Sequence, residues 1–295
     1  MIRSIFFAPA NRHDLLAKFP RFQADCYAVD LEDGTPPGDK ASARGKIAEP
    51  IQALRAQKLA GKLYVRVNEA ASEHFFHDLE AAVQCDIDGI ILPKLERAEQ
   101  LFPILHYIGL AEKAAPEKRR IEIMGGIESI KGVINVVALC AAHERLTAVY
   151  FGAEDFAADM GARRTAAGDE VFYARSQVVI GAKASRIIAL DQAVISIRDD
   201  EQCRRDAIKG RDMAYDGKIC VHPRQVDICN EVFAPSESEI AHAHGVVEAY
   251  GQATARGIGT IDYKGQMIDG PLLKRAETIL AMAQRLQAQK PQGEG

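Results

Sequence analysis

Short apolar runs, many of them rich in β-branched residues, recur at fairly even spacing from Ile5 to Val221. Apolar runs without a polar alternation are typical of strands buried on both faces, as in a parallel sheet. Eight such strands are predicted: Ile5–Ala8, Cys26–Leu31, Leu63–Val67, Gly89–Leu92, Ile121–Met124, Ala148–Phe151, Ile187–Leu190 and Lys218–Val221.

Segments with helical periodicity separate the predicted strands. Three clear ones are Phe75–Gln84, Ile130–Ala142 and Val171–Ala184. Eight strands that alternate with helices predict an α/β fold of the (β/α)8 TIM-barrel type. An open doubly wound sheet is the rival, but no G-x-G-x-x-G follows any of these strands, which favours the barrel.

The C-terminal part has a different pattern. Ser236 and Glu239 are spaced as a capping box, which predicts a helix that runs to about Ala255. A hairpin-like arm then turns at Lys264-Gly265, and a last helix begins at Pro271. We therefore expect a barrel over residues 1–233, a C-terminal helical extension with an arm over 234–290, and a disordered tail over 291–295.

Composition narrows the class of protein. The 295 residues are 47% hydrophobic with a net charge of −4, so no basic field favours nucleic acid as a partner. No apolar run approaches the roughly 20 residues that span a bilayer, and the N-terminus does not resemble a signal peptide. The six cysteines are scattered without a C-x-x-C, which predicts buried thiols and a cytoplasmic protein without membrane partners.

Barrel enzymes build their sites at the carboxyl ends of the strands, and here nearly every predicted strand delivers a polar group there. These groups are Asn11 and Arg12, Asp30 to Asp33, Arg66 and Asn68, Lys94, Glu128, Glu154 and Asp155, Asp191, and His222. Any one of them could have a purely structural role, in a loop salt bridge or as a hydrogen-bonded strand end. Their coincidence on one face predicts an active site.

The stretch from Ile121 to Gly161 is the most informative. Two apolar runs are each followed by glycine and then by acid, Glu128 in one case and Glu154 with Asp155 in the other. Carboxylates from neighbouring strand ends, without a histidine or cysteine cluster, favour Mg²⁺, with Mn²⁺ as an alternative. Glu154 and Asp159 are expected to be supporting charges near the helix start.

Other strand-end residues leave alternatives open. Arg66 is a fixed cation suited to a carboxylate or a developing oxyanion. Lys94 is interpreted either as a Schiff-base nucleophile, which needs a lowered pKa, or as a charged lysine in salt bridges. His222 is either a general base or a hydrogen-bonded histidine at a strand end. Neither G-x-S-x-G nor a Walker loop is present, which disfavours a serine hydrolase or a nucleoside-triphosphate engine.

Nine ordered motifs carry a resemblance over nearly the whole chain, from Arg3 to about Ala283. They are R-S-I-F-F-A-P-A, D-L-E-D-G, R-V-N, P-K, G-I-E-S, G-A-E-D-F-A-A-D-M-G, Y-A-R-S, G-K-I-C-V-H-P-R-Q and G-Q-M-I-D. The chain resembles the citrate lyase β-subunit-like branch of the HpcH/HpaI aldolase superfamily, which includes malyl-CoA, β-methylmalyl-CoA and citramalyl-CoA lyases. The resemblance implies a TIM barrel, a divalent metal, usually Mg²⁺, and a homotrimer.

The resemblance also implies roles for single residues. Glu128 and Asp155 match metal ligands, and Glu128 would also contact the metal-bound substrate. Arg66 matches the arginine at the substrate carbonyl, with Glu32 in the same substrate-binding region. Asp33 matches an acid near the water shell of the metal and is expected to be catalytic.

Asp269 of the M-I-D motif matches a catalytic aspartate that a C-terminal arm brings from the neighbouring subunit. Many relatives have Pro-Gly after the first strand, whereas this chain has Pro9-Ala10, so the methyl group would narrow the backbone approach near the substrate. Arg3, Arg12 and Lys18 are candidates for contacts with the CoA tail, or else solvated surface charges.

The expected function is a Mg²⁺-dependent lyase that cleaves a 3-hydroxyacyl-CoA into acetyl-CoA and a 2-oxo acid. Three rivals remain: a citrate lyase β subunit that acts on an acyl-carrier-protein thioester, a malyl-CoA thioesterase, and a non-enzymatic scaffold or metabolite sensor. The full C-terminal arm favours a free-standing CoA enzyme over the first rival. A scaffold would have no reason to keep acids and arginine at so many strand ends.

Overall fold

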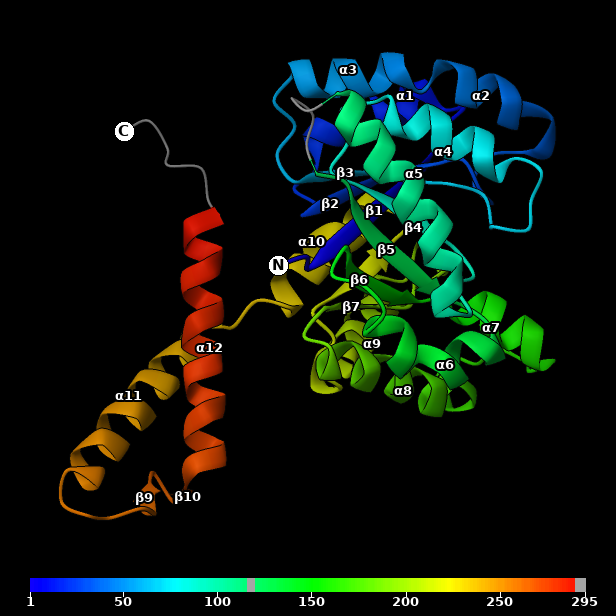
Figure 1. Ribbon diagram of the computed structural model, residues 1–295. Helices are drawn as coiled ribbons and strands as arrows, with labels where there is room; N and C mark the ends of the chain where they lie inside the picture. The colour runs from blue at the N-terminus through cyan, green and yellow to red at the C-terminus, as the bar shows by residue number, and fades with distance from the viewer. Residues whose placement is uncertain (116–119, 290–295) are drawn as a thin grey trace. The chain divides into compact units, whose positions relative to one another are not determined.

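Eight parallel strands close into a barrel in the computed structural model, which describes residues 1–115 and 120–289 (Figure 1). The strands are β1 (Ser4–Pro9), β2 (Cys26–Asp30), β3 (Lys62–Arg66), β4 (Gly89–Leu92), β5 (Glu122–Ile127), β6 (Leu146–Phe151), β7 (Ile188–Asp191) and β8 (Gly217–Cys220). Each strand pairs with the next, and β8 returns to β1. The (β/α)8 prediction is confirmed, and the rival open sheet is wrong because no edge strand remains in this barrel.

Helices follow the strands and form the outer wall of the barrel (Figure 1). They are α1 (His13–Leu16), α2 (Lys40–Lys46), α3 (Ala48–Ala56), α4 (Phe75–Val83), α5 (Leu101–Ala114), α6 (Ile130–Cys140), α7 (Ala153–Met160), α8 (Phe172–Ala184), α9 (Asp200–Asp212) and α10 (Pro223–Val232). Strand side chains that point outward pack against these helices and form the large core. Strand side chains that point into the barrel form a smaller core. Period-two alternation of the strands produces this division.

Strand β5 ends later than the sequence predicts. The expected strand stopped at Met124, because two glycines follow it, but β5 continues through Gly125 and Gly126 to Ile127. A Cβ atom at Gly126 would lie 2.5 Å from the hydroxyl oxygen of Tyr150, which is too close for any side chain. The glycine is therefore part of the strand, and it makes room for side chains at the end of the barrel.

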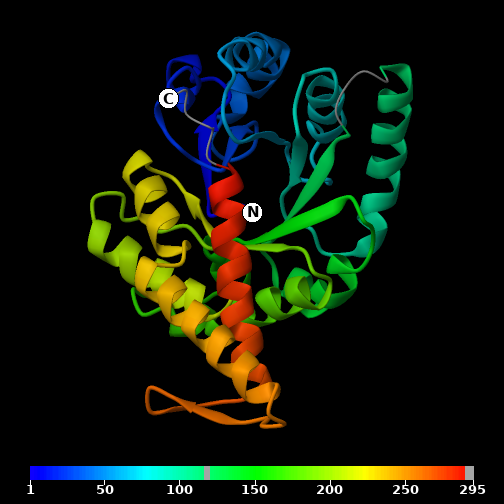
Figure 2. The ribbon, with the colours of Figure 1, turned by 90° about the vertical axis from the view of Figure 1, so that its left-hand side faces the viewer.

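The second unit, from Ala234 onward, is a separate packing unit from Met1–Phe233. It contains α11 (Glu237–Thr254), the hairpin strands β9 (Ile261–Tyr263) and β10 (Gln266–Ile268), and α12 (Gly270–Gln289). The two helices pack on each other, with the hairpin at one end of the pair (Figure 2). The tail expected over 291–295 falls outside the described residues.

Local signals in this unit act as the sequence predicts. The capping box is confirmed, since Ser236 Oγ accepts a hydrogen bond from the Glu239 N–H (3.2 Å) and Glu239 Oε2 accepts one from the Ser236 N–H (2.7 Å). The hairpin turns at Lys264 and Gly265, which have φ values of 53° and 79°. The last helix begins at Gly270, one residue before the predicted start.

Two further expectations concern the whole chain. All six cysteines are free and buried, which confirms the prediction of buried thiols. Among the residues described, no helix is both long enough and apolar enough to cross a membrane.

Candidate active site

Arg66, the last residue of β3, is fixed at the carboxyl end of the barrel by two acids. Its Nε and Nη2 donate to Asp30 Oδ1 (2.8 Å) and Oδ2 (2.6 Å), so the Asp30 pair is bidentate. Its Nη1 lies 3.0 Å from Glu32 Oε2, and the guanidinium carbon lies 5.0 Å from the centre of the Phe7 ring. Burial lowers the pKa of Arg66, but the charge of Asp30 outweighs it and keeps the pKa well above the ordinary value. Arg66 is a permanent, oriented cation.

Glu128 follows β5 directly and is buried, with 3% of its surface exposed. Its Oε1 accepts hydrogen bonds from the Tyr150 hydroxyl and from the Lys94 backbone N–H, the latter at 3.3 Å. Two glycines leave the space for this side chain: a Cβ at Gly152 would lie 2.6 Å from Glu128 Cγ, and Gly126 faces the Tyr150 hydroxyl. The glycines of the two acid-bearing motifs therefore shape the pocket of the carboxylate.

The charge state of Glu128 is finely balanced. Burial raises its pKa, Arg66 and the Tyr150 hydrogen bond lower it, and the neighbouring acids Glu32 and Asp155 raise it again, to about 7. A carboxyl group with this pKa is half-protonated near neutral pH when no cation neutralises it. A bound divalent cation favours the charged form of such a group.

Lys94 contacts three acids at the end of β4. Its Nζ lies 3.4 Å from Glu32 Oε1 and 3.6 Å from Asp155 Oδ1, and its N–H donates to Glu128. Its φ of 50° is unusual for a residue with a side chain, and strain of this kind clusters at functional sites. Burial lowers the Lys94 pKa, but Glu32 and Asp155 outweigh this effect and raise it. The salt-bridge interpretation of Lys94 is therefore favoured, because a Schiff-base lysine needs a lowered pKa.

The acids offer donors that fit a magnesium ion. Asp155 lies in the first turn of α7 with 38% of its side chain exposed, and its charge affects the pKa of Glu128, so the two carboxylates are neighbours. Glu32 Oε2 is buried and ion-paired with Arg66 Nη1 at 3.0 Å, but it accepts no hydrogen bond of good geometry in the part of the chain described. No cluster of three or more histidine, cysteine or acidic ligands occurs among the described residues. Mg²⁺ is commonly held by one or two carboxylates while water and substrate complete its shell, which suits this set.

Several predicted strand-end residues have structural partners instead. Asn68 donates to the Leu31 carbonyl (2.9 Å) and accepts the Lys40 ammonium, and its N–H donates to Asp78 (3.0 Å). His222 is the N-cap of α10, where its Nδ1 accepts the Arg224 N–H at 3.4 Å. The hydrogen-bonded interpretation of His222 is therefore favoured over a general base.

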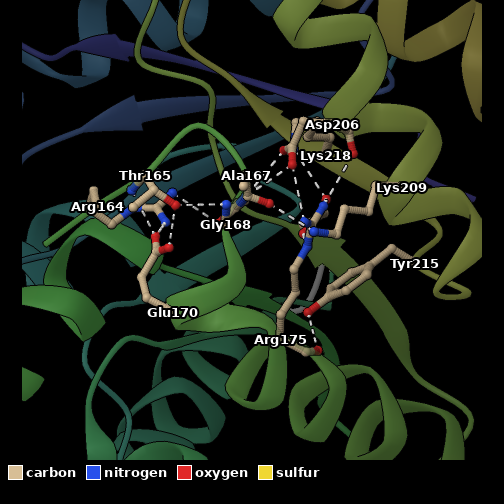
Figure 3. Close-up of polar contacts among 12 residues, drawn as sticks. Arg164, Thr165, Ala167, Gly168, Glu170, Arg175, Asp206, Lys209, Tyr215 and Lys218 are labelled. Atoms are coloured by element: carbon tan, nitrogen blue, oxygen red, sulfur yellow. Dashed lines mark hydrogen bonds and ion pairs between the residues drawn. The ribbon is translucent and has the colours of Figure 1, made fainter. Parts of the chain in front are cut away.

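The sequence predicted Asp191, the last residue of β7, as a site residue. In the structure it belongs to a buried ionic network between the strands of the barrel and the helices α8 and α9. Arg175 of α8 donates to Asp191 Oδ1 (2.7 Å) and lies 3.1 Å from Asp206 Oδ1, while Lys218 lies 3.2 Å from Asp191 Oδ2. Figure 3 shows Arg175, Asp206 and Lys218 directed toward one another. Sequence reasoning missed this network, although a lysine inside the apolar run of β8 was a signal for it.

A loop beside the site connects to this network through Gln192. Arg164 donates to Glu154 Oε1 (2.9 Å) and to Gln192 Oε1 (3.2 Å), and it also pairs with Glu170, as Figure 3 shows. Gln192 in turn donates to Asp206 Oδ1 at 3.2 Å. Glu154 thus lies beside Asp155 in the first turn of α7 and pairs with Arg164.

Asp159 also has a supporting role, since its Oδ2 accepts the Ile130 N–H (2.8 Å) at the start of α6. Arg3 corrects an expectation: it precedes β1, at the opposite end of the barrel, and donates to Asp25 through Nε and Nη2 (both 2.8 Å). It does not lie near the first βα loop, so the position expected for it is wrong.

The structure brings Arg66, Glu32, Glu128 and Asp155 together through direct contacts and mutual electrostatics. Asp33 is exposed, and its charge raises the pKa values of Glu32 and Lys94, so it lies at the rim of this group. Asp269 lies in the second unit, at the start of α12.

Asp269 begins that helix through two contacts. Its backbone carbonyl accepts the Leu273 N–H (2.9 Å), and its Oδ1 accepts the Leu272 N–H (3.4 Å).

An eight-stranded parallel barrel with an oriented arginine and buried carboxylates at its carboxyl end defines the class of TIM-barrel enzymes. The family model described as HpcH/HpaI aldolase/citrate lyase matches residues 3–223, and the chain belongs to this family.

Two relatives of this chain illustrate the family. The "citrate lyase subunit beta-like protein" of Deinococcus radiodurans is 38% identical over 95% of this chain and 97% of its own length. The "L-malyl-CoA/beta-methylmalyl-CoA lyase" of Cereibacter sphaeroides is 31% identical over 97% of this chain and 96% of its own length. Relatives of this kind are carbon–carbon lyases, and the chain is an enzyme of that class.

A solved structure supports the fold over both units. The CitE protein of Mycobacterium tuberculosis, in complex with magnesium, acetoacetate and coenzyme A, has a TM-score of 0.76 and 28% identity to this chain. The match covers 95% of this chain and 97% of that one.

Proposed function

We propose that this chain is a Mg²⁺-dependent acyl-CoA lyase. It splits a 3-hydroxyacyl-CoA of the malyl-CoA or citramalyl-CoA type into acetyl-CoA and a 2-oxo acid, glyoxylate or pyruvate. The observation that carries the proposal is the convergence of an oriented Arg66 with the carboxylates of Glu128 and Asp155 at one end of the barrel. Two relatives support it: the Cereibacter enzyme is named for malyl-CoA, and the Mycobacterium protein was solved with magnesium and coenzyme A.

The proposed reaction makes two demands on the protein. A carboxylate at the site takes the proton of the substrate hydroxyl, the bond between the hydroxyl-bearing carbon and the α-carbon of the thioester breaks, and the electron pair of that bond becomes a thioester enolate. Protonation of the enolate carbon then gives acetyl-CoA. The protein must therefore stabilise charge at the 2-oxo acid part and at the enolate oxygen, and it must deliver a proton to carbon.

The residues of the barrel suit the first demand. Glu128 and Asp155 would hold Mg²⁺, which when bound supplies Lewis-acid polarisation of the 2-oxo acid oxygens. Arg66 presents Nη1 while Asp30 holds its other edge, so little reorganisation is needed when negative charge forms on the enolate oxygen. A single well-placed donor of this kind is worth roughly 3–4 kcal/mol. Glu32 and Asp33 would position the oxygens and water molecules around the ion.

The second demand falls on Asp269. A carboxylic acid within reach of the enolate carbon delivers the proton. In the reverse reaction, the condensation, its carboxylate removes a proton from the acetyl methyl group. We place this group in a homotrimer, where the C-terminal unit of one subunit would complete the barrel site of its neighbour.

The test is a turnover panel with malyl-CoA, β-methylmalyl-CoA and citramalyl-CoA. We expect Mg²⁺-dependent cleavage of at least one thioester, to acetyl-CoA from malyl-CoA or citramalyl-CoA, or to propionyl-CoA from β-methylmalyl-CoA. Activity should be lost in EDTA and recover when Mg²⁺ is returned; Mn²⁺ is compared in parallel. No cleavage of any of the three by Mg²⁺-loaded protein would contradict the proposal. Free CoA and malate in place of acetyl-CoA and glyoxylate would instead identify a thioesterase.

A second candidate is the β subunit of citrate lyase, which the name of the Deinococcus relative favours. Such a subunit would cleave a citryl thioester carried by an acyl-carrier protein and would need partner subunits. Citryl and malyl thioesters of CoA and of an acyl-carrier protein, compared at equal concentration, separate the two candidates. The proposed enzyme prefers the CoA thioesters, whereas the subunit prefers the carrier-bound citryl group.

A further inference from the structure

Tyr150 lies inside the barrel, between the two strand ends that bear the proposed metal ligands. It belongs to β6, is 2% exposed, and packs in the inner core with neighbours such as Met124 and Leu190. Its hydroxyl donates to Glu128 Oε1. A tyrosine hydroxyl this deep in an apolar core requires a partner, and Glu128 is that partner.

The two oxygens of Glu128 are treated differently by the protein. Oε1 accepts the Tyr150 hydroxyl and the Lys94 N–H, whereas no described residue donates a hydrogen bond to Oε2. Tyr150 is also the only side chain in the described ranges that donates to this carboxylate. The pair is built into the fold, because a Cβ at Gly126 would lie 2.5 Å from the Tyr150 hydroxyl oxygen and would displace it.

We infer that Tyr150 is a positioning residue for the metal site: it occupies Oε1 of Glu128 and thereby directs Oε2 to the cation. The inference rests on the proposed function, because it takes Glu128 as a magnesium ligand. Groups that hydrogen-bond a metal ligand from behind fix its orientation, and their loss commonly weakens metal affinity 10–100-fold. In this role Tyr150 acts through Glu128, the carboxylate to which its hydroxyl donates.

The experiment compares Tyr150→Phe with the wild type by calorimetric titration of the apoprotein with MgCl₂ alone. The substitution removes one oxygen and keeps the ring in the core. We expect the Kd for Mg²⁺ to rise about 10–100-fold. In turnover assays the Mg²⁺ concentration for half-maximal rate rises by the same factor, while kcat at saturating Mg²⁺ changes less than about threefold.

The chain contains a matched control at the other end of the barrel. Tyr64 of β3 is fully buried in the same inner core, and its hydroxyl donates to Glu122, the first residue of β5. Tyr64→Phe therefore removes a partly buried hydroxyl–carboxylate bond far along the strands from the proposed site, while Glu122 keeps its pair with Lys62. It should lower thermal stability without changing the Kd for Mg²⁺.

Each outcome has a definite meaning. An unchanged Kd in Tyr150→Phe, or an equal change in Tyr64→Phe, overturns the inference and leaves the proposed function standing. A wild-type protein that does not bind Mg²⁺ contradicts the proposed function itself. Should Tyr150→Phe fold poorly, the stabilities of Tyr150→Phe, Glu128→Gln and the double variant in EDTA form a thermodynamic cycle. Additive effects in that cycle overturn the inference, and coupling between the two sites supports it.

Discussion

The guanidinium of Arg66 is oriented before any ligand arrives, because Asp30 binds two of its nitrogens and the Phe7 ring covers one face. What remains for a substrate is the side of Nη1, which Glu32 approaches at 3.0 Å. At the scale of single residues, most donor and acceptor atoms of the site are already paired, and the few that remain point in fixed directions. Glu128 follows the same rule, with one oxygen engaged and the other without a donor.

Arg66→Lys tests the value of this orientation. Lysine keeps the charge but loses the planar bidentate pair with Asp30, so we expect kcat/KM to fall about 10²–10³-fold. The matched control is Arg3→Lys, which removes a similar bidentate pair with Asp25 at the opposite end of the barrel. Steady-state kinetics should show the loss only in the Arg66 variant, and an equal loss in both would attribute it to stability.

The raised pKa of Glu128 predicts how metal binding depends on pH. The carboxyl group must lose its proton to bind a cation, and burial raises its pKa to about 7 in the metal-free protein. Below that pH the Kd for Mg²⁺ should rise about tenfold per pH unit, and above it the Kd should level off. Titration calorimetry between pH 5.5 and about pH 8.5 measures this, and a flat profile would show that Glu128 is not the ligand.

The same group affects the stability of the metal-free protein in a defined direction. Its folded pKa lies above the ordinary value of 4.5, so the folded state holds more protons than the unfolded chain between these two values. The contribution of Glu128 therefore becomes less favourable as the pH rises from about 4.5 to about 7. Glu128→Gln should remove this slope, as chemical denaturation in EDTA can measure.

Sequence reasoning reached Glu128, Asp155 and Arg66 because acid after a glycine-bounded strand, and arginine at a strand end, are local patterns. It did not reach Tyr150, because a tyrosine inside an apolar strand has the same pattern as a core residue. Only the register of β5 against β6 places its hydroxyl beside Glu128. Residues that act through another residue are visible only when the strands are assembled.

At the scale of elements, the barrel follows from strands that are apolar on both faces and alternate with helices. The sequence therefore predicts strand order and number well. It places the end of β5 too early, since glycine disfavours strands on average, yet Gly125 and Gly126 remain in the ladder here. It also assigns Asp191 to the site, whereas the outward direction of that side chain puts it against α8 and α9.

The buried ionic network between these elements gives a prediction about stability. Burial raises the pKa of Asp206, but Lys218 and Arg175 outweigh it and lower the pKa from 3.8 to about 2. Asp206→Asn leaves these two buried cations short of a partner, so we expect a loss of about 3 kcal/mol in the free energy of unfolding at pH 7. Urea denaturation measures this loss.

The sign of its pH dependence is also fixed. The folded pKa is depressed, so the contribution of Asp206 is present above pH 3.8 and is lost as the pH falls through about 2. The difference between wild type and variant should therefore shrink in that window. The control Glu231→Gln breaks an exposed pair with Arg204 and should leave the free energy of unfolding nearly unchanged. An Asp206→Asn protein as stable as this control would contradict the assignment.

At the scale of the whole molecule, the proposed chemistry divides between two packing units. The barrel contains the residues proposed to bind the cation and to stabilise charge, and the second unit contains Asp269 at the start of α12. The expectation that a neighbouring subunit supplies Asp269 came only from the resemblance, because assembly leaves no periodic pattern in a sequence. The choice among 2-oxo acids is equally hidden, since one methyl group in a pocket is worth only about 1–3 kcal/mol.

Complementation between inactive variants tests this division. We expect Asp269→Asn to lose at least about 10²-fold in kcat while keeping the wild-type Kd for Mg²⁺. The control Asp262→Asn alters the hairpin that precedes Asp269, where Asp262 accepts a hydrogen bond from the Gly265 N–H at 2.9 Å, and should keep most of the activity. Mixed and reassembled Asp269→Asn and Arg66→Lys subunits should recover part of the activity, because some sites receive both intact residues. No recovery in verified mixed oligomers would place Asp269 and Arg66 of the same chain in one site.

The most direct test of the proposed chemistry is the cleavage of malyl-CoA or citramalyl-CoA by the Mg²⁺-loaded protein in D₂O, followed by mass spectrometry of the thioester product. Carbon–carbon cleavage through an enolate that is protonated at carbon predicts acetyl-CoA with one deuterium in its methyl group, together with one equivalent of glyoxylate or pyruvate. Release of free CoA with the four- or five-carbon acid intact, or no reaction with either thioester, would contradict the assignment of this chain as an acyl-CoA lyase.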